Sequence, residues 1–143
     1  MSYRCNELSL QLPGVRVIDQ TLNILKLPDL GSTLIISRGA LEPGQTLESA
    51  FATQMAALAQ SAPDFQEERR AAMRVGHSGD IDAIETYIRF TQGEATVHQW
   101  QLACRRPGED IMLALSYART TPLEARDTEF CNRIKQSIEL TGV

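Results

Sequence analysis

The sequence predicts an α+β domain in which one large antiparallel sheet of about seven strands packs with two helices, in the order βββ-α-ββββ-α. Three observations support this fold. Short apolar segments bounded by turn residues follow one another along most of the chain, apolar residues recur at helical spacing after Thr46, and a helix-start pattern follows residue 120. The 143 residues contain no internal repeat and no long linker, so we expect residues 1–143 to form a single domain.

The first half of the chain is expected to form three strands and a helix. The strands cover residues 4–12, 21–27 and 33–41, which are apolar-rich and separated by stretches that contain Pro and Gly. From Thr46 onward, apolar residues recur at three- and four-residue steps. This pattern indicates a helix with Thr46 as its N-cap and Pro63 beyond its end.

The second half is expected to form four longer strands and a final helix. The strands cover residues 65–75, 81–91, 95–105 and 111–119, and the tight connections between them suit antiparallel neighbours. The helix follows the motif TPLE at 121–124. We expect Thr121 to cap this helix, Pro122 to take its first position and Glu124 to complete a capping box.

Composition and charge exclude several classes of protein. The 14 Lys and Arg residues against 18 Asp and Glu residues give a formal charge of −4, which argues against a nucleic-acid partner. No apolar run approaches the roughly 18–20 residues of a membrane-spanning helix, so we expect no membrane insertion. The N-terminus lacks the regions of an export signal, which indicates a cytoplasmic protein. The three cysteines, Cys5, Cys104 and Cys131, are widely spaced and expected to be reduced.

No pattern of residues predicts an enzyme. The two histidines, His77 and His98, lie in no recognisable catalytic motif. The sequence has no phosphate-binding loop, no dinucleotide-binding glycine motif and no Cys-x-x-Cys pair. We therefore expect no catalytic residues, no cofactor and no metal.

The strands offer more apolar surface than two helices can cover. A sheet with one buried face normally alternates apolar and polar residues, but segments 22–27, 34–36 and 111–118 are rich in apolar residues on both alternating sets. Two helices of about 15 residues, each roughly 22 Å long and 10 Å across, cannot cover both faces of such a sheet. The remaining surface is covered by loops, sheet twist and a homodimer contact, or it forms a groove for an apolar partner.

Three glutamines stand among apolar residues. Gln54 interrupts the apolar stripe of the first predicted helix, and Gln99 and Gln101 lie beside Val97 and Ala103 on a predicted strand. An amide donates and accepts hydrogen bonds without the cost of burying a charge. The amides therefore suit a partner that brings backbone or small polar groups in an apolar context, or they bind neighbouring backbone groups and water.

The sequence resembles the Eag effector-associated chaperones of bacterial type VI secretion, which belong to the DcrB-like group. The resemblance rests on DQTLNIL at 19–25, PGQTLE at 43–48 and QWQ at 99–101, in an element order shared over nearly the whole chain. It implies a single DcrB-like domain with a curved sheet and a Mog/PsbP-like fold. It also implies a cytoplasmic homodimer that binds the N-terminal transmembrane helices and pre-PAAR segment of an effector, and shields them until the effector is loaded on the secretion spike.

In that family, apolar side chains and glutamines on a concave sheet face and on the first helix imitate the packing of helices in a membrane. Because a shift of one residue would move every strand position to the opposite face, His98 and Trp100 remain alternates. The positions of this chain that match the family pattern are Leu22, Ile24, Ile36, Gln54, Leu58, Val97, Gln99 and Gln101.

Two other functions are compatible with the sequence. A regulatory or scaffold module of the same fold would bind a folded protein through loops or edges, so charges at Leu22, Ile24 or Gln54 would leave its binding intact. An enzyme of the nuclear-transport-factor type would need a deep enclosed cavity with an ionisable group, for which His98 and Tyr117 are the candidates.

Overall fold

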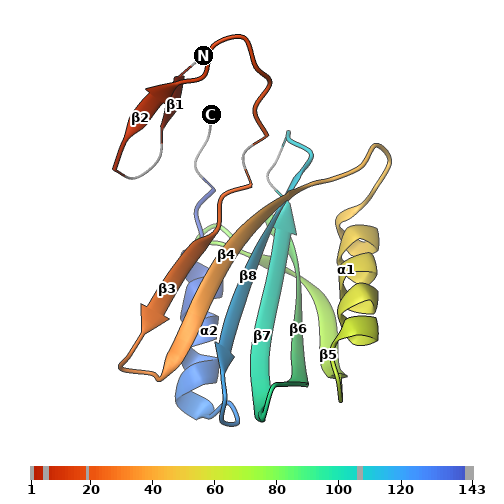
Figure 1. Cartoon of the computed structure of the whole chain (residues 1–143). Coiled ribbons are helices and arrows are strands. Elements are labelled where there is room, and N and C mark those ends of the chain that lie inside the picture. The colour runs from red at the N-terminus through yellow and green to blue at the C-terminus, as the bar shows by residue number, and fades with distance from the viewer. Residues whose placement is uncertain (1, 5–6, 19, 106–107, 141–143) are drawn as a thin grey trace.

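A computed structural model describes residues 2–4, 7–18, 20–105 and 108–140 (Figure 1). Six strands form one antiparallel sheet in the order β3-β4-β8-β7-β6-β5, and two short strands form a separate small sheet. This large sheet with its two helices confirms the α+β fold. The elements are β1 (Ser2–Arg4), β2 (Ser9–Gln11), β3 (Asn23–Leu27), β4 (Ser32–Ala40), α1 (Leu47–Ser61), β5 (Gln66–Val75), β6 (Ile81–Gln92), β7 (Ala95–Arg105), β8 (Ile111–Arg119) and α2 (Ala125–Ser137).

The N-terminal segment differs from the prediction. Residues 4–12 do not form one strand of the large sheet, which therefore has six strands. Instead β1 and β2 pair with each other, with Ser2 opposite Gln11, at a distance from the large sheet (Figure 1). The chain reverses direction between Arg4 and Ser9, and the intervening segment contains neither Gly nor Pro. The usual sequence signal of a turn was therefore missing.

The two helices begin in different ways. α1 starts as predicted, because Thr46 Oγ1 accepts from the Ser49 N–H at 3.0 Å and Ser49 Oγ accepts from the Thr46 N–H at 3.0 Å. The prediction for α2 was wrong by three residues. Its N-cap is Glu124, whose backbone N–H donates to the Asp127 carboxylate at 2.7 Å, and Thr121 lies before the helix.

The face of the sheet that packs against α2, here called the α2 face, holds the larger part of the core. Trp100, Leu102 and Tyr117 are completely buried there. The Trp100 indole donates to Glu85 Oε2 at 2.8 Å, and Lys135 on α2 lies 2.9 Å from the same oxygen. Because this partly buried carboxylate has two donors, α2 is held on the sheet by polar contacts as well as by apolar packing.

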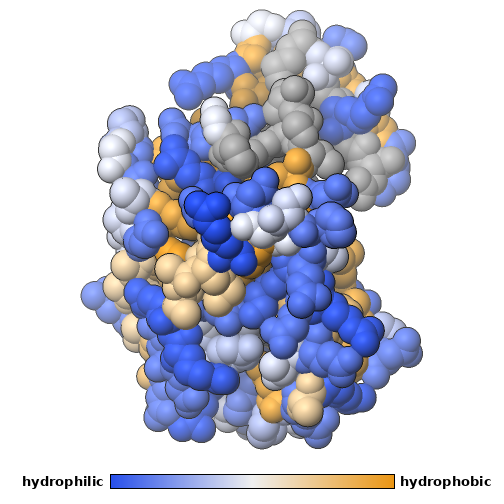
Figure 2. All heavy atoms as spheres, turned by 180° about the vertical axis from the view of Figure 1, so that it is seen from behind, coloured by the Kyte–Doolittle hydropathy of each residue, from blue (hydrophilic) through white to orange (hydrophobic). Residues whose placement is uncertain are grey.

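The outer side of α2 is exposed and polar. Glu129, Asn132, Arg133 and Gln136 all face solvent. The view of the molecule from behind shows mostly hydrophilic residues with smaller apolar patches between them (Figure 2). This helix therefore presents its apolar side to the sheet and its polar side to water.

The opposite face, here called the α1 face, is covered over only part of its width. The helix α1 packs mainly against β6 and β7, so β3, β4 and β8 lie outside its cover. Ile24 on β3 is 58% exposed. Exposed apolar surface is therefore present at the β3 edge of this open half, where the polar residues Lys26 and Thr33 share the same face. On the covered half, α1 contacts the sheet through Leu47, Phe51 and Met55, which pack against Ile84, Ile88 and Ala103.

Two further expectations concern cysteines and membranes. Cys104 and Cys131 are free and buried, as predicted, whereas Cys5 lies outside the described residues. Among the described residues, no helix combines the length and apolar character needed to cross a membrane.

Candidate binding groove

A groove of about 350 Å³ opens on the α1 face, between α1 and the strands β4 and β8. Its helical wall is a stripe of α1 beside the core stripe, with residues at the i, i+3, i+4 and i+7 positions. This stripe consists of Ala50, Thr53, Gln54 and Ala57, and the other lining residues are Ser37, Arg38, Gly39, Ala40, Leu41, Gln45, Met112 and Ala114.

The floor of the groove consists mainly of small residues. Ser37 on β4 pairs with Ala114 on β8, and Gly39 pairs with Met112 two positions along. Ala114 also pairs with Ala103, which contacts α1, so these side chains point to the α1 face. A Cβ built at Gly39 would meet no atom within 4 Å. The floor therefore leaves room for another segment to approach the strands closely.

The open surface continues from the groove toward the β3 edge. The next row on the α1 face runs across four neighbouring strands and consists of Ile24, Ile35, Ser116 and Gln101. Gln101 donates to Gln99 Oε1 at 2.9 Å and is only 8% exposed. The row thus joins the exposed Ile24 at the sheet edge to the buried Gln101, which is bonded to the half-buried Gln99.

Gln54 offers a different kind of amide. It is exposed on α1 and lines the groove. Within the described part of the chain, no hydrogen bond joins its side chain to another group. Its donor and acceptor are therefore available to a partner that enters the groove.

The structure brings together four of the predicted binding residues on the open half of the α1 face. Ile24, Gln99 and Gln101 share this face by strand register, and Gln54 faces the same space from α1. Strand alternation and the helical stripe together explain this convergence.

Three other predicted residues take different positions. Val97 lies on the α1 face but is only 8% exposed, and Leu58 packs partly buried against the core beneath α1. Neither of these two residues lines the groove. Leu22 lies just before β3 and is 58% exposed.

The placement of Ile36 beside Ile24 was wrong. Ile36 pairs with Leu115, which stands opposite Leu102 in the core beneath α2. Ile24 pairs instead with Ile35, which therefore takes the predicted place of Ile36 on the α1 face. A one-residue difference in register moves a side chain to the other face, and apolar residues at both positions gave no means of choosing.

The two alternate binding positions, His98 and Trp100, also lie on the α2 face. Trp100 is completely buried, and His98 stands opposite Arg119 at the end of the same face. Neither residue contributes to the groove.

The sequence did not reveal the floor of the groove or most of its helical wall. Small residues such as Ser37 and Ala57 give no sign of a binding site until the structure places them together.

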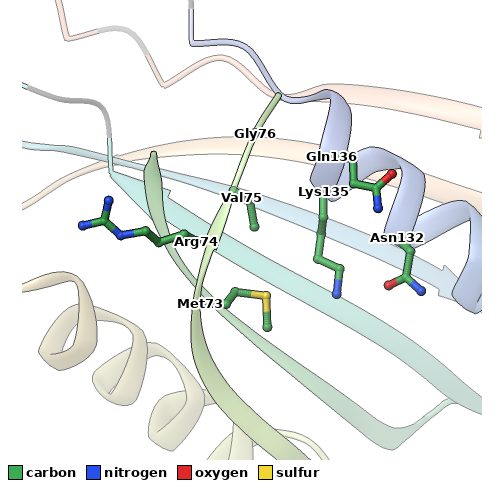
Figure 3. Close-up of a pocket in the computed structure, with 7 residues that line it drawn as sticks. All are labelled: Met73, Arg74, Val75, Gly76, Asn132, Lys135 and Gln136. Atoms are coloured by element: carbon green, nitrogen blue, oxygen red, sulfur yellow. The ribbon is translucent and has the colours of Figure 1, made fainter. Parts of the chain in front are cut away.

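A separate hollow of about 260 Å³ lies between β5 and α2 (Figure 3). Lys135 reaches into this space from α2 but is paired with Glu85, whereas Arg74 points away from the helix and lies 3.5 Å from Asp82. Both cations therefore already have carboxylate partners.

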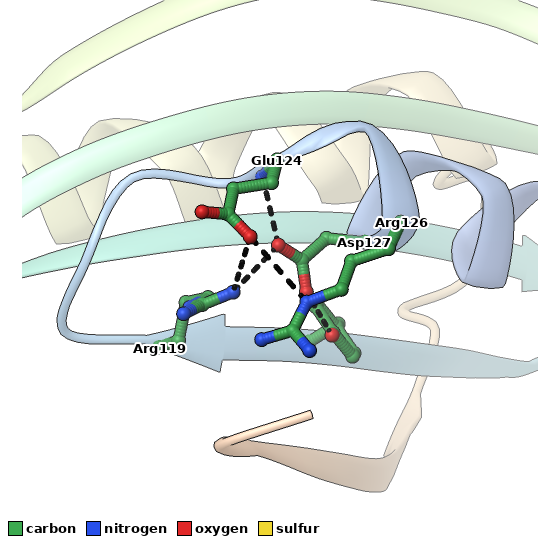
Figure 4. Close-up of polar contacts among 5 residues, drawn as sticks. Arg119, Glu124, Arg126 and Asp127 are labelled. Carbon is green, nitrogen blue, oxygen red and sulfur yellow. Dashed lines mark hydrogen bonds and ion pairs between the residues drawn. The ribbon is translucent and has the colours of Figure 1, made fainter. Parts of the chain in front are cut away.

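A buried polar cluster fixes the start of α2 against β8 (Figure 4). The Tyr117 hydroxyl donates to Asp127 Oδ1 at 2.5 Å, and Arg119 donates to Asp127 Oδ2 at 2.8 Å. Glu124 links Arg119 and Arg126 at 3.9 and 3.4 Å. The cluster belongs to the α2 face and does not reach the groove.

Two pKa values follow from this cluster. Burial alone would raise the pKa of Asp127, but hydrogen bonds from the Glu124 backbone, Tyr117 and Arg119 hold it below its usual range. Burial, with the hydrogen bond to Asp127, raises the pKa of Tyr117 to about 12.

In the described part of the chain, no group of three or more His, Cys, Asp and Glu side chains could hold a metal ion.

Comparisons with known proteins agree with this fold. The family model named DcrB matches residues 7–137. Among solved structures, the chain is similar to a protein of unknown function from Pseudomonas aeruginosa for which a regulatory role has been suggested, with a TM-score of 0.76 and 20% identity over 100% of this chain and 98% of that one. This likeness shows the fold, and no curated protein matches. Since the family model covers most of its length, the chain belongs to the DcrB family.

Proposed function

We propose that this protein is a chaperone that binds and shields the N-terminal transmembrane and pre-PAAR region of a type VI secretion effector. It acts in the cytoplasm, before the effector is loaded on the secretion spike. The observation that carries this proposal is the open half of the α1 face, where a groove with a floor of small residues continues to the exposed Ile24. A large apolar side chain exposed beside such a groove offers surface that a partner can bury.

The groove suits an apolar helix in its chemistry. Small residues allow helices to approach closely in membranes, and the floor of the groove offers the same freedom. Arg38 is the charged residue among those that line it, but it stands opposite Leu113, so its side chain points to the α2 face. There its guanidinium donates to the Thr21 carbonyl at 3.0 Å and to Asn23 Oδ1 at 2.9 Å. An entering helix therefore meets amides and aliphatic groups, because this charge lies on the other side of the sheet.

Two neighbouring alanines on α1 provide a matched test. Ala56 and Ala57 are both exposed, but only Ala57 lines the groove. The effector's N-terminal fragment, with its apolar helices, is co-expressed with the wild type, with Ala57→Glu or with Ala56→Glu. We expect the wild type and Ala56→Glu to keep the fragment in solution and to elute with it on size exclusion. Ala57→Glu should not, because burying a carboxylate against an apolar helix costs several kcal/mol.

The outcome is decisive when both variants melt at the temperature of the wild type. A fragment that stays insoluble with the wild type would overturn the proposal. Equal capture by Ala56→Glu and Ala57→Glu would overturn the groove as the binding site.

We also infer that the protein forms a homodimer through its N-terminal segment. In the part of the chain that the structure describes, all seven well-exposed large apolar side chains lie between Leu8 and Leu25. The strands β1 and β2 pair only with each other, and an isolated two-stranded sheet is marginal in water. A two-fold axis would bring β1 and β2 of two copies together and cover Leu8 and Leu10, while Ile24 stays open to the effector.

Light scattering tests the homodimer. We expect a wild-type mass of two chains, and we expect Leu8→Ser combined with Leu10→Ser to shift the protein to one chain without lowering its helix content. A wild-type mass of one chain, or an unchanged dimer in the double variant, would contradict this inference.

A regulatory or scaffold module is the second candidate function. The suggested regulatory role of the similar Pseudomonas aeruginosa protein favours it. Such a module would bind a folded partner through loops or edges. Ala57→Glu would then leave that binding intact, which separates the two candidates.

A further inference from the structure

A second hollow, of about 300 Å³, lies at one end of the α2 face near the start of α2. Arg69, Arg89 and His98 line it together with Tyr87 and with Leu123 from the loop before the helix. We propose that this hollow binds the carboxylate of an acidic side chain on a protein partner, with apolar residues beside that side chain.

The backbone of β5 is distorted in a way that brings Arg69 into the hollow. The pairing of β5 with β6 shifts between Glu68 and Ala71, which inserts an extra residue into β5. Arg69 has a φ of 56°, a conformation that residues with a long side chain rarely adopt. As a result its guanidinium lies 4.3 Å from the centre of the Tyr87 ring on the α2 face. Strained backbone of this kind concentrates at functional sites.

The basic side chains of the hollow lack acidic partners. Arg89 stands opposite His98, which stands opposite Arg119, so basic residues form a row across three neighbouring strands. Arg119 is neutralised by the acidic residues at the start of α2. Within the described ranges, neither Arg69 nor Arg89 has a carboxylate at ion-pair distance. Arg89 is held instead by the neutral Gln66, whose Oε1 accepts from its Nε at 2.9 Å.

The hollow between β5 and α2 shows the opposite arrangement. There Lys135 is paired with Glu85, and Arg74 with Asp82. Cations in that hollow are neutralised by the chain itself, so a further anion would gain little. The hollow at the start of α2 differs, because among the described residues no carboxylate lies at ion-pair distance from Arg69 or Arg89.

The charge balance favours a carboxylate over a phosphate. Arg69 and Arg89 contribute two positive charges and Glu68, which also lines the hollow, contributes one negative charge, leaving an excess of one. A carboxylate balances this excess, whereas a phosphate dianion exceeds it. Guanidinium groups bind carboxylates through paired hydrogen bonds. The apolar side chains of Pro122 and Leu123, which also line the hollow, suit apolar residues beside the acidic one.

A peptide titration followed by the backbone amide signals of the ¹⁵N-labelled protein tests the site. The probes are acetyl-Leu-Glu-Leu-amide, its neutral counterpart acetyl-Leu-Gln-Leu-amide, and inorganic phosphate, all at the same ionic strength. We expect the Glu peptide to shift the signals of Arg69, Arg89 and His98, and the Gln peptide to bind about tenfold more weakly or worse.

Three variants locate the effect. Arg69→Gln combined with Arg89→Gln should weaken the Glu peptide by about tenfold or more. Arg74→Gln, on the same strand but outside the hollow, should bind like the wild type. Arg69→Gly removes the cation and relieves the backbone, because glycine accepts a φ of 56° without strain. It should therefore lose affinity while melting at the same or a higher temperature.

Equal shifts with the Glu and Gln peptides would overturn the proposal, as would full affinity in Arg69→Gly. Phosphate that shifts these signals while the Glu peptide does not would overturn it in favour of a free anion. None of these results bears on the groove, which lies on the α1 face and is tested by Ala57→Glu.

Discussion

The two faces of the sheet are covered to different extents, and this difference separates stability from binding. On the α2 face, Trp100 and Leu102 are completely buried. On the α1 face of the same strand, Gln99 and Gln101 lie next to a half-open surface. Alternation along one strand therefore supplies a closed core on one side and an amide pair beside the groove on the other. Substitutions at neighbouring positions should thus have unrelated effects.

The largest contrast is expected between two aliphatic side chains. Leu102→Ala removes a completely buried side chain and should lower the free energy of unfolding by about 2–5 kcal/mol. Ile24→Ala removes a side chain that is 58% exposed, and it should lower that free energy by about 0.5 kcal/mol or less. Urea unfolding measures both. Losses of equal size would remove the distinction between the faces.

The polar cluster on the α2 face should give the next largest effect. Asp127→Asn breaks a buried pair with Arg119 and should cost about 2–3 kcal/mol at neutral pH. The pKa of Asp127 is lowered in the folded state, so its contribution is present at neutral pH and disappears as the pH falls through that lowered value. Stability measured against pH should therefore fall less steeply in acid for the variant.

The matched control for this effect is Asp110→Asn. Asp110 pairs with Arg105 at 2.7 Å, but its side chain is 71% exposed. Because exposed ion pairs contribute about 0–1 kcal/mol, this variant should keep the acid dependence of the wild type. A similar loss in both variants would contradict the special role of the cluster.

The thiols on the α2 side report how tightly that side is closed. Burial raises the pKa of Cys104 to about 11 and, together with nearby carboxylates, that of Cys131 to about 12. In a Cys5→Ser background at about pH 8, both thiols should react with Ellman's reagent only as fast as the protein unfolds. Fast reaction in the folded protein would show that α2 opens readily.

The smallest effect on stability is expected on the open face. Gln54→Ala replaces an exposed helical residue, so the free energy of unfolding should stay the same or rise by about 0.3 kcal/mol. Thermal unfolding measures this change. The same variant should hold the effector fragment less tightly on size exclusion, because the groove loses its free amide. Unchanged retention would show that Gln54 does not take part in binding.

The sequence was sufficient for elements whose signals are local. The cap at Thr46 uses only a side chain and the next turn of helix, and β5 to β8 are long segments between clear turns. The start of α2 was misplaced because it depends on Asp127, whose carboxylate is held by Tyr117 and Arg119 from β8. A contact between segments that are distant in the sequence cannot be predicted from the residues next to the helix start.

The candidate groove could be predicted only in part for the same reason. Gln54 was singled out because an amide interrupts the apolar stripe of its helix, and Ile24 because it lies in a segment that resembles the family pattern. The choice between Ile35 and Ile36 needed the pairing of β3 with β4, which places Ile24 opposite Ile35. The floor around Ser37 and Ala114 was invisible, since its distinguishing property is the lack of a large side chain.

The two edge strands of the large sheet, β5 and β3, differ in how readily they can pair with a further strand. At one edge, β5 is interrupted by the irregularity at Arg69 and carries the charged run at 67–70, which hinders the addition of another strand. At the other edge, β3 pairs with β4 without interruption and exposes two large apolar residues, Ile24 at 58% and Leu25 at 44%. Any pairing of two copies along β3 would leave β5 at both outer ends of the joined sheet. Assembly by strand addition then stops at a pair and cannot continue into a fibre.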